Sequence, residues 1–188
     1  MSITAGAFPP EALKRAAAVQ LVVLDVDGVL TDGALIYGDK GEELKIFNVH
    51  DGTGLVLLLQ AGVKVIWITG RESAAVAVRG KELGVNAVFQ GVRDKLTLFL
   101  NILKERGLKK EQAACMGDDI HDLLLLSHAG LAVAPSNAQP ALKSMAHYVT
   151  SSQGGRGAVR ELCDLILQAH GKWDRILERF QLEMVNEK

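Results

Sequence analysis

Short apolar runs, several of them rich in β-branched residues, recur along the chain, and each is followed by a longer stretch with helical character. Near-continuous apolarity over so few residues is typical of strands covered on both faces, as in a parallel sheet. The alternation of such runs with helices predicts a three-layer α/β/α sandwich of the Rossmann-like type. The expected strands are Leu21–Leu24, Val63–Ile68, Ala87–Phe89, Ala113–Met116 and Leu131–Val133. The expected helices are about Gly52–Ala61, Glu72–Leu83, Lys95–Arg106, Asp119–His128 and Ala138–Met145.

Two segments depart from this alternation. The segment of about 33–47 contains two strand-like pieces around the turn-rich Gly38–Gly41, which predicts a β-hairpin inserted after the first strand. A C-terminal tail of about 151–188 is expected to carry a helix from Ala158 to Ala169 and an amphipathic segment from Trp173 to about Met184. We expect residues 1–188 to form one domain, because the length suits one domain of ordinary size.

The composition excludes several classes of protein. Lys and Arg number 21 against 22 acidic residues, so we expect neither a nucleic acid nor a membrane as partner. Two cysteines are too few for a disulfide-stapled secreted scaffold, and no apolar run has the roughly 18–20 residues needed to span a bilayer. Met1 to Pro10 lacks the pattern of a secretory signal, which leads us to expect a soluble, cytoplasmic protein.

The first predicted strand runs directly into the acidic segment Asp25–Asp32. Ligands of open α/β sheets bind beyond the carboxyl ends of the strands, so Asp25 and Asp27 are expected in an active crevice. Two neighbouring carboxylates repel each other unless a cation holds them, and Mg²⁺ prefers such oxygen ligands. A plain Asp- and Gly-rich turn or helix cap remains an alternative. A calcium loop does not fit, because Val29 and Ile36 stand where that loop requires ligands.

Three further strand ends or helix starts carry polar residues suited to a phosphoryl group. Thr69-Gly70-Arg71 follows the second strand and supplies a hydroxyl, a flexible backbone and a guanidinium. Lys95 opens a predicted helix, and Asp118 to Asp122 follow the fourth strand. Each has an ordinary structural explanation when taken singly, as a turn, a solvated lysine or a helix cap. Their occurrence together, each at a strand end or helix start, favours a phosphoryl-transfer site.

In this order, the four segments resemble the four motifs of the haloacid-dehalogenase-like phosphohydrolases, and the resemblance extends from about Gln20 to Ala169. Within that superfamily the chain is most similar to the 3-deoxy-D-manno-octulosonate 8-phosphate phosphatases of lipopolysaccharide synthesis. These enzymes lack a large cap domain, which agrees with the short hairpin. The segments that carry this closer resemblance are Asp25–Asp32, Phe47–Val49, Asp51-Gly52, Ile68–Arg71, Gln90-Gly91, Asp94-Lys95 and Gly154–Glu161.

The resemblance implies a role for each matching residue. Asp25 would be the nucleophile that forms an aspartyl-phosphate, and Asp27 the general acid and base. Thr69 and Lys95 would hold the phosphoryl oxygens. Mg²⁺ would be bound by Asp25, the Asp27 carbonyl and Asp118, and Asp122 would support these ligands without binding the ion directly. The substrate pocket would be lined by Asp27, Asn48, Val49, His50, Asp51, Gly52, Gly70, Arg71, Arg79 and Lys95.

The same resemblance implies a homotetramer in which the hairpins form a common barrel and the C-terminal tail reaches a neighbouring site. We expect the glycine-rich segment from Gly154 to Arg160 to be the mobile part of that tail. Two positions depart from the family pattern, since His50 and Val56 stand where many members have basic residues. The substrate carboxylate would then rely on Arg71, Arg79 or the neighbouring tail.

Three alternatives stay open. The first is a phosphatase for a related nine-carbon sugar acid phosphate, and the second is a non-catalytic sugar-phosphate-binding subunit. The third, a signalling receiver domain, is disfavoured because the paired aspartates follow the first strand rather than the third. We interpret His121 as a helix-face residue rather than a metal ligand, and Cys115 as a buried apolar residue.

Overall fold

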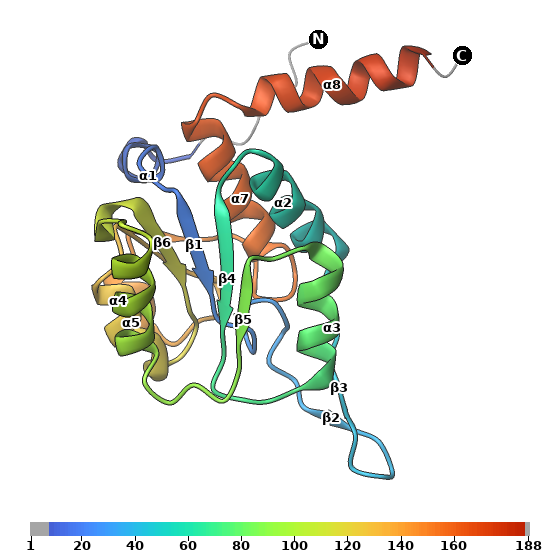
Figure 1. Cartoon of the computed structure of the whole chain (residues 1–188), viewed down its shortest axis with the longest axis vertical. Helices are drawn as coiled ribbons and strands as arrows, with labels where there is room; N and C mark the ends of the chain where they lie inside the picture. The colour runs from blue at the N-terminus through green and yellow to red at the C-terminus, as the bar shows by residue number, and fades with distance from the viewer. Residues whose placement is uncertain (1–7, 187–188) are drawn as a thin grey trace.

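The computed structural model describes residues 8–186, and its side chains are described as far as residue 180. Within this part of the chain, parallel strands form a six-stranded sheet in the order β5-β4-β1-β6-β7-β8 (Figure 1). β1 lies at the centre, where Leu24 is in register with Trp67 of β4 on one side and Met116 of β6 on the other. The strands are β1 (Leu21–Leu24), β4 (Lys64–Ile68), β5 (Ala87–Phe89), β6 (Ala113–Met116), β7 (Leu131–Ala134) and β8 (Tyr148–Val149).

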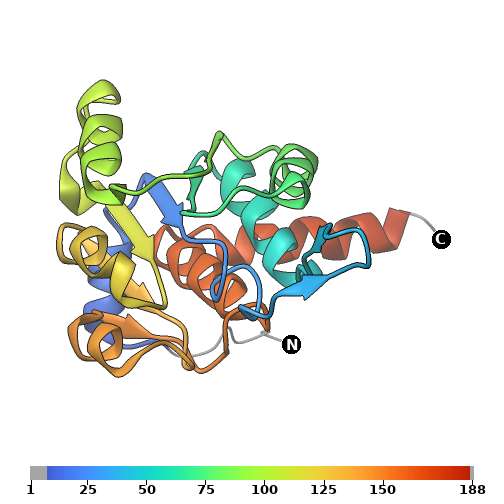
Figure 2. The same ribbon diagram turned by 90° about the horizontal axis from the view of Figure 1, so that it is seen from below.

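Helices cover both faces of the sheet and complete three layers. One face is covered by α1 (Pro10–Ala16), α2 (Val49–Gln60), α3 (Ala74–Leu83) and α7 (Ala158–Ala169). The other face is covered by α4 (Lys95–Glu105), α5 (Leu123–Ser127) and α6 (Pro140–Met145). Figure 2 shows the two groups on opposite sides of the strands. Short 3-10 turns, η1 (Lys110–Gln112) and η2 (Ile120–Asp122), precede β6 and α5.

The two hydrophobic cores follow from the alternation of side chains along each strand. In β1, Val22 and Leu24 point into the core under α2 and α7, whereas Leu21 and Val23 point into the core under α4 and α5. All four residues are fully buried. The near-continuous apolar runs of the sequence are therefore explained by a sheet that is covered on both faces.

The hairpin consists of β2 (Ile36–Tyr37) and β3 (Glu43–Leu44), which pair antiparallel and project from the body of the molecule (Figure 1). Large apolar side chains on it are exposed, with exposed fractions from 37% for Ile36 to 65% for Ile46. At the opposite edge of the sheet, α8 (Trp173–Asn186) leaves the end of α7 and extends away from the body. No helix of residues 8–186 is long and apolar enough to cross a membrane.

The predicted fold class and hairpin are confirmed, with local differences at element ends. α2 begins at Val49 rather than Gly52, because the Asn48 side chain accepts hydrogen bonds from the backbone N–H groups of His50 and Asp51. The helix expected over Asp119–His128 is divided into η2 and the shorter α5. α1 and β8 have no counterpart among the predicted elements.

Candidate active site

Asp25 and Asp27 follow the central strand β1 and lie at the carboxyl edge of the sheet. The backbone N–H of Asp25 donates to the carbonyl of Met116 at 3.1 Å, which continues the β1–β6 pairing as far as the predicted nucleophile. The chain then turns through Gly28, whose φ of +85° favours glycine. A Cβ atom at Gly28 would also stand 2.0 Å from Oδ2 of Asp118. The glycine therefore lets Asp118, after β6, lie close to the Asp25–Asp32 segment after β1.

β4 ends at the residues predicted to hold a phosphoryl group. Thr69 is buried, and its hydroxyl accepts a hydrogen bond from the backbone N–H of Arg71 at 3.2 Å. The carbonyl of Thr69 accepts from the N–H of Val92 at 3.0 Å, and that of Arg71 accepts from Gly91 at 3.2 Å. These bonds tie the loop after β5 to the end of β4, which brings the start of α4 to the same edge of the sheet.

Lys95 is the first residue of α4, and its ammonium group lies between two carboxylates. Asp94 caps the helix by accepting from the N–H of Thr97 at 3.0 Å. The side chain of Lys95 is only 8% exposed, with Nζ 2.9 Å from Oδ1 of Asp25 and 2.7 Å from Oδ1 of Asp122. Burial disfavours the charged amine, but these two carboxylates outweigh it and raise the pKa of Lys95. Lys95 is therefore a fixed positive charge next to the predicted nucleophile.

The segment after β6 supplies the remaining carboxylates. Asp122 is 1% exposed, and both of its oxygens are engaged: Oδ1 accepts from Lys95 and Oδ2 accepts from the backbone N–H of Asp118 at 3.2 Å. Asp118 is less buried than Asp122 and also lines the cleft, and its Oδ1 is buried without a hydrogen-bond partner among the described residues. Asp122 thus orients Lys95 and Asp118, while Asp118 keeps an oxygen free for a ligand.

The carboxylates repel one another in the absence of a cation. Burial and, after it, the charge of Asp122 together raise the pKa of Asp25 to about 6, against the opposing effect of Lys95. Burial, followed by the charges of Asp25 and Asp122, raises the pKa of Asp118 to about 7. A bound divalent cation would relieve this cost, because it favours the ionised form of each carboxylate.

The donor set fits Mg²⁺. Asp25, Asp118 and Asp122 each offer a carboxylate oxygen, and the three oxygens lie within 4.8 Å of one another. All are hard oxygen donors, as Mg²⁺ prefers, and the unpartnered Oδ1 of Asp118 faces no competing protein donor. Because both oxygens of Asp122 already have partners, Asp25 and Asp118 are the better direct ligands.

A cleft of about 530 Å³ opens over these groups at the carboxyl edge of the sheet. It contains every residue predicted to act on the phosphoryl group or the metal. It also contains Arg93 and His121, for which the sequence predicted no role at the site. The cleft is lined by Asp25, Asp27, Gly33, Thr69, Gly70, Arg71, Val92, Arg93, Lys95, Asp118, Asp119, His121 and Asp122.

Most of the other predicted substrate-binding residues do not line this cleft. Asn48 caps α2, and Val49 is 70% exposed. His50 lines a separate hollow of about 690 Å³ together with Arg156, Arg160 and Trp173. Val56, one of the two positions that depart from the family pattern, is half-buried on α2.

Asp51, Gly52 and Arg79 lie at contacts between helices in this chain. The buried Asp51 carboxylate accepts from the backbone N–H of Arg160 at 2.7 Å and of Gly157 at 3.3 Å, so it caps α7 from α2. A Cβ on Gly52 would stand 2.4 Å from Nη2 of Arg79, which shows that the α3 guanidinium passes directly over the start of α2. Their positions reflect packing between α2, α3 and α7.

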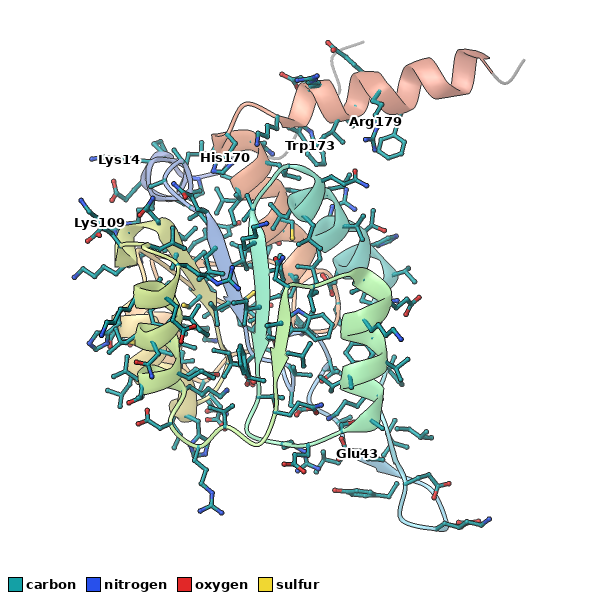
Figure 3. The ribbon with its side chains drawn as sticks, in the orientation of Figure 1. Lys14, Glu43, Lys109, His170, Trp173 and Arg179 are labelled. Carbon is teal, nitrogen blue, oxygen red and sulfur yellow. The ribbon has the colours of Figure 1, made fainter. Side chains whose placement is uncertain are left out.

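The hairpin contributes charged groups, Glu43 and Lys45, whose place at the site the sequence did not predict. Lys45 follows β3 and contacts Oδ1 of Asp27 and, at 2.6 Å, Oε1 of Glu43. Arg71 contacts the other oxygen of Glu43 at 2.5 Å and the hydroxyl of Tyr37 at 3.3 Å. Burial lowers the pKa of Lys45, but its hydrogen bonds to Asp27 and Glu43 outweigh that effect and raise it. Figure 3 labels Glu43 at the base of the hairpin, beside the carboxyl edge of the sheet.

The glycine-rich segment at Gly154 is packed against its own chain, contrary to the expectation that it reaches a neighbour. The N–H of Gly155 donates to the carbonyl of Val29 at 2.9 Å, and that of Gly154 donates to Oδ1 of Asn137 at 2.9 Å. Arg156 lies 3.2 Å from Asp32. This segment therefore supports the loop of residues 25–32. Of the predicted C-terminal tail, only α8 extends away from the body of the molecule (Figure 1).

Comparison with known proteins shows the family to which the chain is similar. Residues 87–162 match the model of the haloacid dehalogenase-like hydrolase family. The chain is 44% identical over 167 residues to the 3-deoxy-D-manno-octulosonate 8-phosphate phosphatase of Yersinia pestis, covering 89% of each chain. It is 43% identical over 169 residues to the enzyme of the same name from Escherichia coli K12, covering 90% of each.

The fold is shared with solved structures of such enzymes. The Yersinia pestis phosphatase superposes with a TM-score of 0.88 at 43% identity, over 90% of this chain and 91% of that one. The Moraxella catarrhalis phosphatase, solved with magnesium, phosphate and KDO, gives a TM-score of 0.90 at 40% identity, over 92% of this chain and 99% of that one. The chain belongs to the 3-deoxy-D-manno-octulosonate 8-phosphate phosphatase family of the haloacid dehalogenase-like hydrolases.

Proposed function

We propose that this protein hydrolyses 3-deoxy-D-manno-octulosonate 8-phosphate to the free sugar acid and phosphate in lipopolysaccharide synthesis. The observation that carries the proposal is the placement of Asp25, Lys95 and Asp118 around one cleft in a member of this family. The relatives of about 44% identity act, by their names, on this substrate. An intact set of reacting groups disfavours a non-catalytic binding subunit.

In the proposed first step, a carboxylate oxygen of Asp25 attacks phosphorus while the bond to the sugar oxygen breaks. Lys95 stands 2.9 Å from the Asp25 carboxylate, so its charge is in place where negative charge accumulates in the transition state. The buried Thr69 hydroxyl and the Gly70 backbone border the same space and would bind the phosphoryl oxygens. Because these groups are already fixed, little reorganisation accompanies the reaction.

Asp27 is proposed to move the protons. It would first give a proton to the departing sugar oxygen and then take one from the water that attacks the aspartyl-phosphate. Asp25, Asp118 and the Asp27 carbonyl would hold Mg²⁺. Asp122 would support them through its hydrogen bonds with Lys95 and the backbone of Asp118. When bound, the ion neutralises phosphoryl charge and keeps the carboxylates ionised.

Arg71 is the proposed contact for the substrate carboxylate, because it alone among the predicted substrate arginines lines the cleft. A guanidinium can clamp a carboxylate with two parallel hydrogen bonds. Its present partner, Glu43, would have to share it with the substrate. Arg79 lies against α2 in this chain and would contribute only after a change of conformation.

Phosphate release across a panel of sugar phosphates tests the proposed activity. We expect the eight-carbon acid phosphate to give the highest kcat/KM, chelation to abolish turnover and added Mg²⁺ to restore it. Faster turnover of a nine-carbon sugar acid phosphate would replace the proposed substrate. Full turnover in chelator would exclude the metal.

We also propose a homotetramer joined through the hairpins. Leu35, Tyr37, Leu44 and Ile46 on this projecting segment are all at least half exposed, an apolar surface that association would cover. Light scattering of the protein at micromolar concentration should give the mass of four chains. Ile46→Asp should lower that mass; a wild-type monomer with full activity would contradict the proposal.

The proposed role of α8 is to reach the cleft of a neighbouring copy. α8 begins at the edge of the sheet opposite its own cleft, so within its own chain it points away from the site (Figure 1). A chain truncated after Lys172 should fold, bind Mg²⁺ normally and lose activity. Co-expression with a full-length Asp25→Asn chain should restore activity, because each supplies what the other lacks; no restoration would contradict the role in trans.

We also propose that the protein is cytoplasmic and forms a single domain. Cytoplasmic location is supported by the absence of a disulfide among the described residues, where Cys115 and Cys163 are free and buried. A single domain over residues 1–188 is supported by the way α1 packs on α7, far along the chain. Fractionation and limited proteolysis test the two proposals, which predict a cytoplasmic protein and no stable half-chain fragments.

A further inference from the structure

The hairpin residue Lys45 is buried against the proposed general acid and base. Its side chain is 2% exposed, and its ammonium group contacts Oδ1 of Asp27 on one side and Oε1 of Glu43, at 2.6 Å, on the other. Glu43 is itself held by Arg71 at 2.5 Å. Lys45 is thus fixed between the hairpin and the loop of the first motif.

This contact makes the two oxygens of Asp27 different. Oδ1 accepts the hydrogen bond from Lys45. Oδ2 is buried, finds no hydrogen-bond partner among the described residues and lies 3.9 Å from Nε of Arg71 at the cleft. The two oxygens of a carboxylate are equivalent, so whichever of them binds Lys45, the other lies toward Arg71 and the cleft. In this structure that available oxygen is Oδ2.

We propose that Lys45 is a positioning residue that holds Oδ1 of Asp27 and so assigns proton transfer to Oδ2. In the first step, the proton on Oδ2 passes to the sugar oxygen as its bond to phosphorus breaks and the bond from Asp25 to phosphorus forms. In the second step, water attacks phosphorus, its proton goes to Oδ2 and the bond to Asp25 breaks. The inference rests on the proposed role of Asp27.

A purely structural role explains this arrangement less well. Removing a lysine from water is costly, and an apolar side chain of similar length would join the hairpin to the body without that cost. β2 and β3 have two residues each and lack the length to place a side chain precisely by themselves. The paired contacts of Lys45 supply that precision at the atom whose position matters for proton transfer.

The test uses aryl phosphates of matched size and graded leaving-group basicity. Protonation by Asp27 matters most for a basic leaving group and least for an acidic phenol. Lys45→Met should therefore steepen the dependence of kcat/KM on leaving-group basicity. We expect a loss of about 10–100-fold with the sugar phosphate and little loss with the most acidic phenol, because positioning accounts for part of the ~10²–10⁴-fold that general acid catalysis supplies.

Lys40→Met is the matched control, since Lys40 is an exposed lysine of the same hairpin. It should leave the dependence on the leaving group unchanged. The inhibition constant of inorganic phosphate, which has no leaving group, should be the same in wild type and both variants. A uniform loss with every substrate in Lys45→Met would show a structural effect and overturn the proposal.

Asp27→Asn, measured with the same series, separates this inference from the proposed function. A steeper dependence in Asp27→Asn but not in Lys45→Met overturns the positioning role alone. An unchanged dependence in Asp27→Asn overturns the acid role of Asp27 and the inference with it. If Lys45→Met does not fold, the double variant Glu43→Gln/Lys45→Met takes its place, because it also neutralises Glu43, which loses its partner when Lys45 is removed. A steeper dependence of kcat/KM on leaving-group basicity in the double variant supports the positioning role, and an unchanged dependence overturns it.

Discussion

Gly154 lies so close to the carbonyl oxygen of Gly28 that a Cβ atom on Gly154 would stand 1.7 Å from it. Gly154→Ala must therefore displace the loop that carries Asp27. We expect a loss of about 1–3 kcal/mol in unfolding free energy from overpacking. We also expect kcat/KM to fall by about tenfold or more, because small misplacements of reacting groups are costly.

The control for this variant is Gly107→Ala. Gly107 has a φ of +63° and open space around its Cβ position, so alanine there should cost about 1 kcal/mol from backbone strain alone. Urea unfolding and steady-state kinetics give the two quantities. Equal kcat/KM in the two variants would show that Gly154 does not support the site.

Asp25→Asn should reduce turnover to background, because an amide cannot form the aspartyl-phosphate. Asp27→Asn should retain a trace of activity, with kcat lower by about 10²–10⁴-fold. Both variants should give the wild-type circular dichroism spectrum. Normal turnover in a folded Asp25→Asn protein would refute the mechanism.

The stabilisation that Mg²⁺ gives should increase with pH. The pKa values of Asp25 and Asp118, raised to about 6 and about 7, exceed the ordinary value of 3.8. Between about pH 4 and 7 the unfolded chain therefore binds fewer protons than the metal-free folded protein, and these groups make stability fall as pH rises. Mg²⁺ binds the ionised carboxylates and opposes this loss.

Thermal unfolding with and without Mg²⁺ measures this effect. The increase in Tm should be larger at about pH 8 than at about pH 5, where protons compete with the cation. Asp118→Asn should remove most of the increase at both pH values. An equal increase at both pH values in the wild-type protein would contradict the assigned carboxylates.

Asp51→Asn should destabilise the protein without weakening substrate binding. The buried Asp51 carboxylate accepts from the N–H groups of Gly157 and Arg160, and an amide can replace only part of this interaction. We expect a loss of about 1–3 kcal/mol in unfolding free energy with an unchanged KM. The control, Asp39→Asn in the exposed hairpin turn, should change neither quantity. A raised KM with unchanged stability would instead support the predicted contact with substrate.

The sequence was sufficient to predict which residues gather at the cleft wherever they follow a strand. Asp25, Thr69 and Asp118 come together because the carboxyl ends of parallel strands share one edge, a rule that needs only the order of the elements. Lys45 could not be predicted, since its approach to Asp27 depends on how a short hairpin folds back over the sheet.

Contacts between segments far apart in the sequence also determine the surroundings of Asp51. The family resemblance implied a pocket role for Asp51, which stays a prediction. Its contact with α7, where its carboxylate caps a helix that begins far along the chain, could not be predicted from the sequence. Local pattern likewise missed β8, whose two residues pair only because β7 already lies beside them. Interactions between distant segments, and not local propensity, decide each of these cases.

The central place of β1 also has a consequence for synthesis on the ribosome. One edge of β1 is paired by β4, which is translated soon after it, whereas the other edge waits for β6. Until then an unpaired central edge is exposed, and α2 remains without its partner α7. The protein must therefore emerge almost whole before Gly155 docks on Val29. We therefore expect no phosphatase activity from a nascent chain that ends before this contact. A chaperone that shields half a sheet would serve this fold better than one that acts after release.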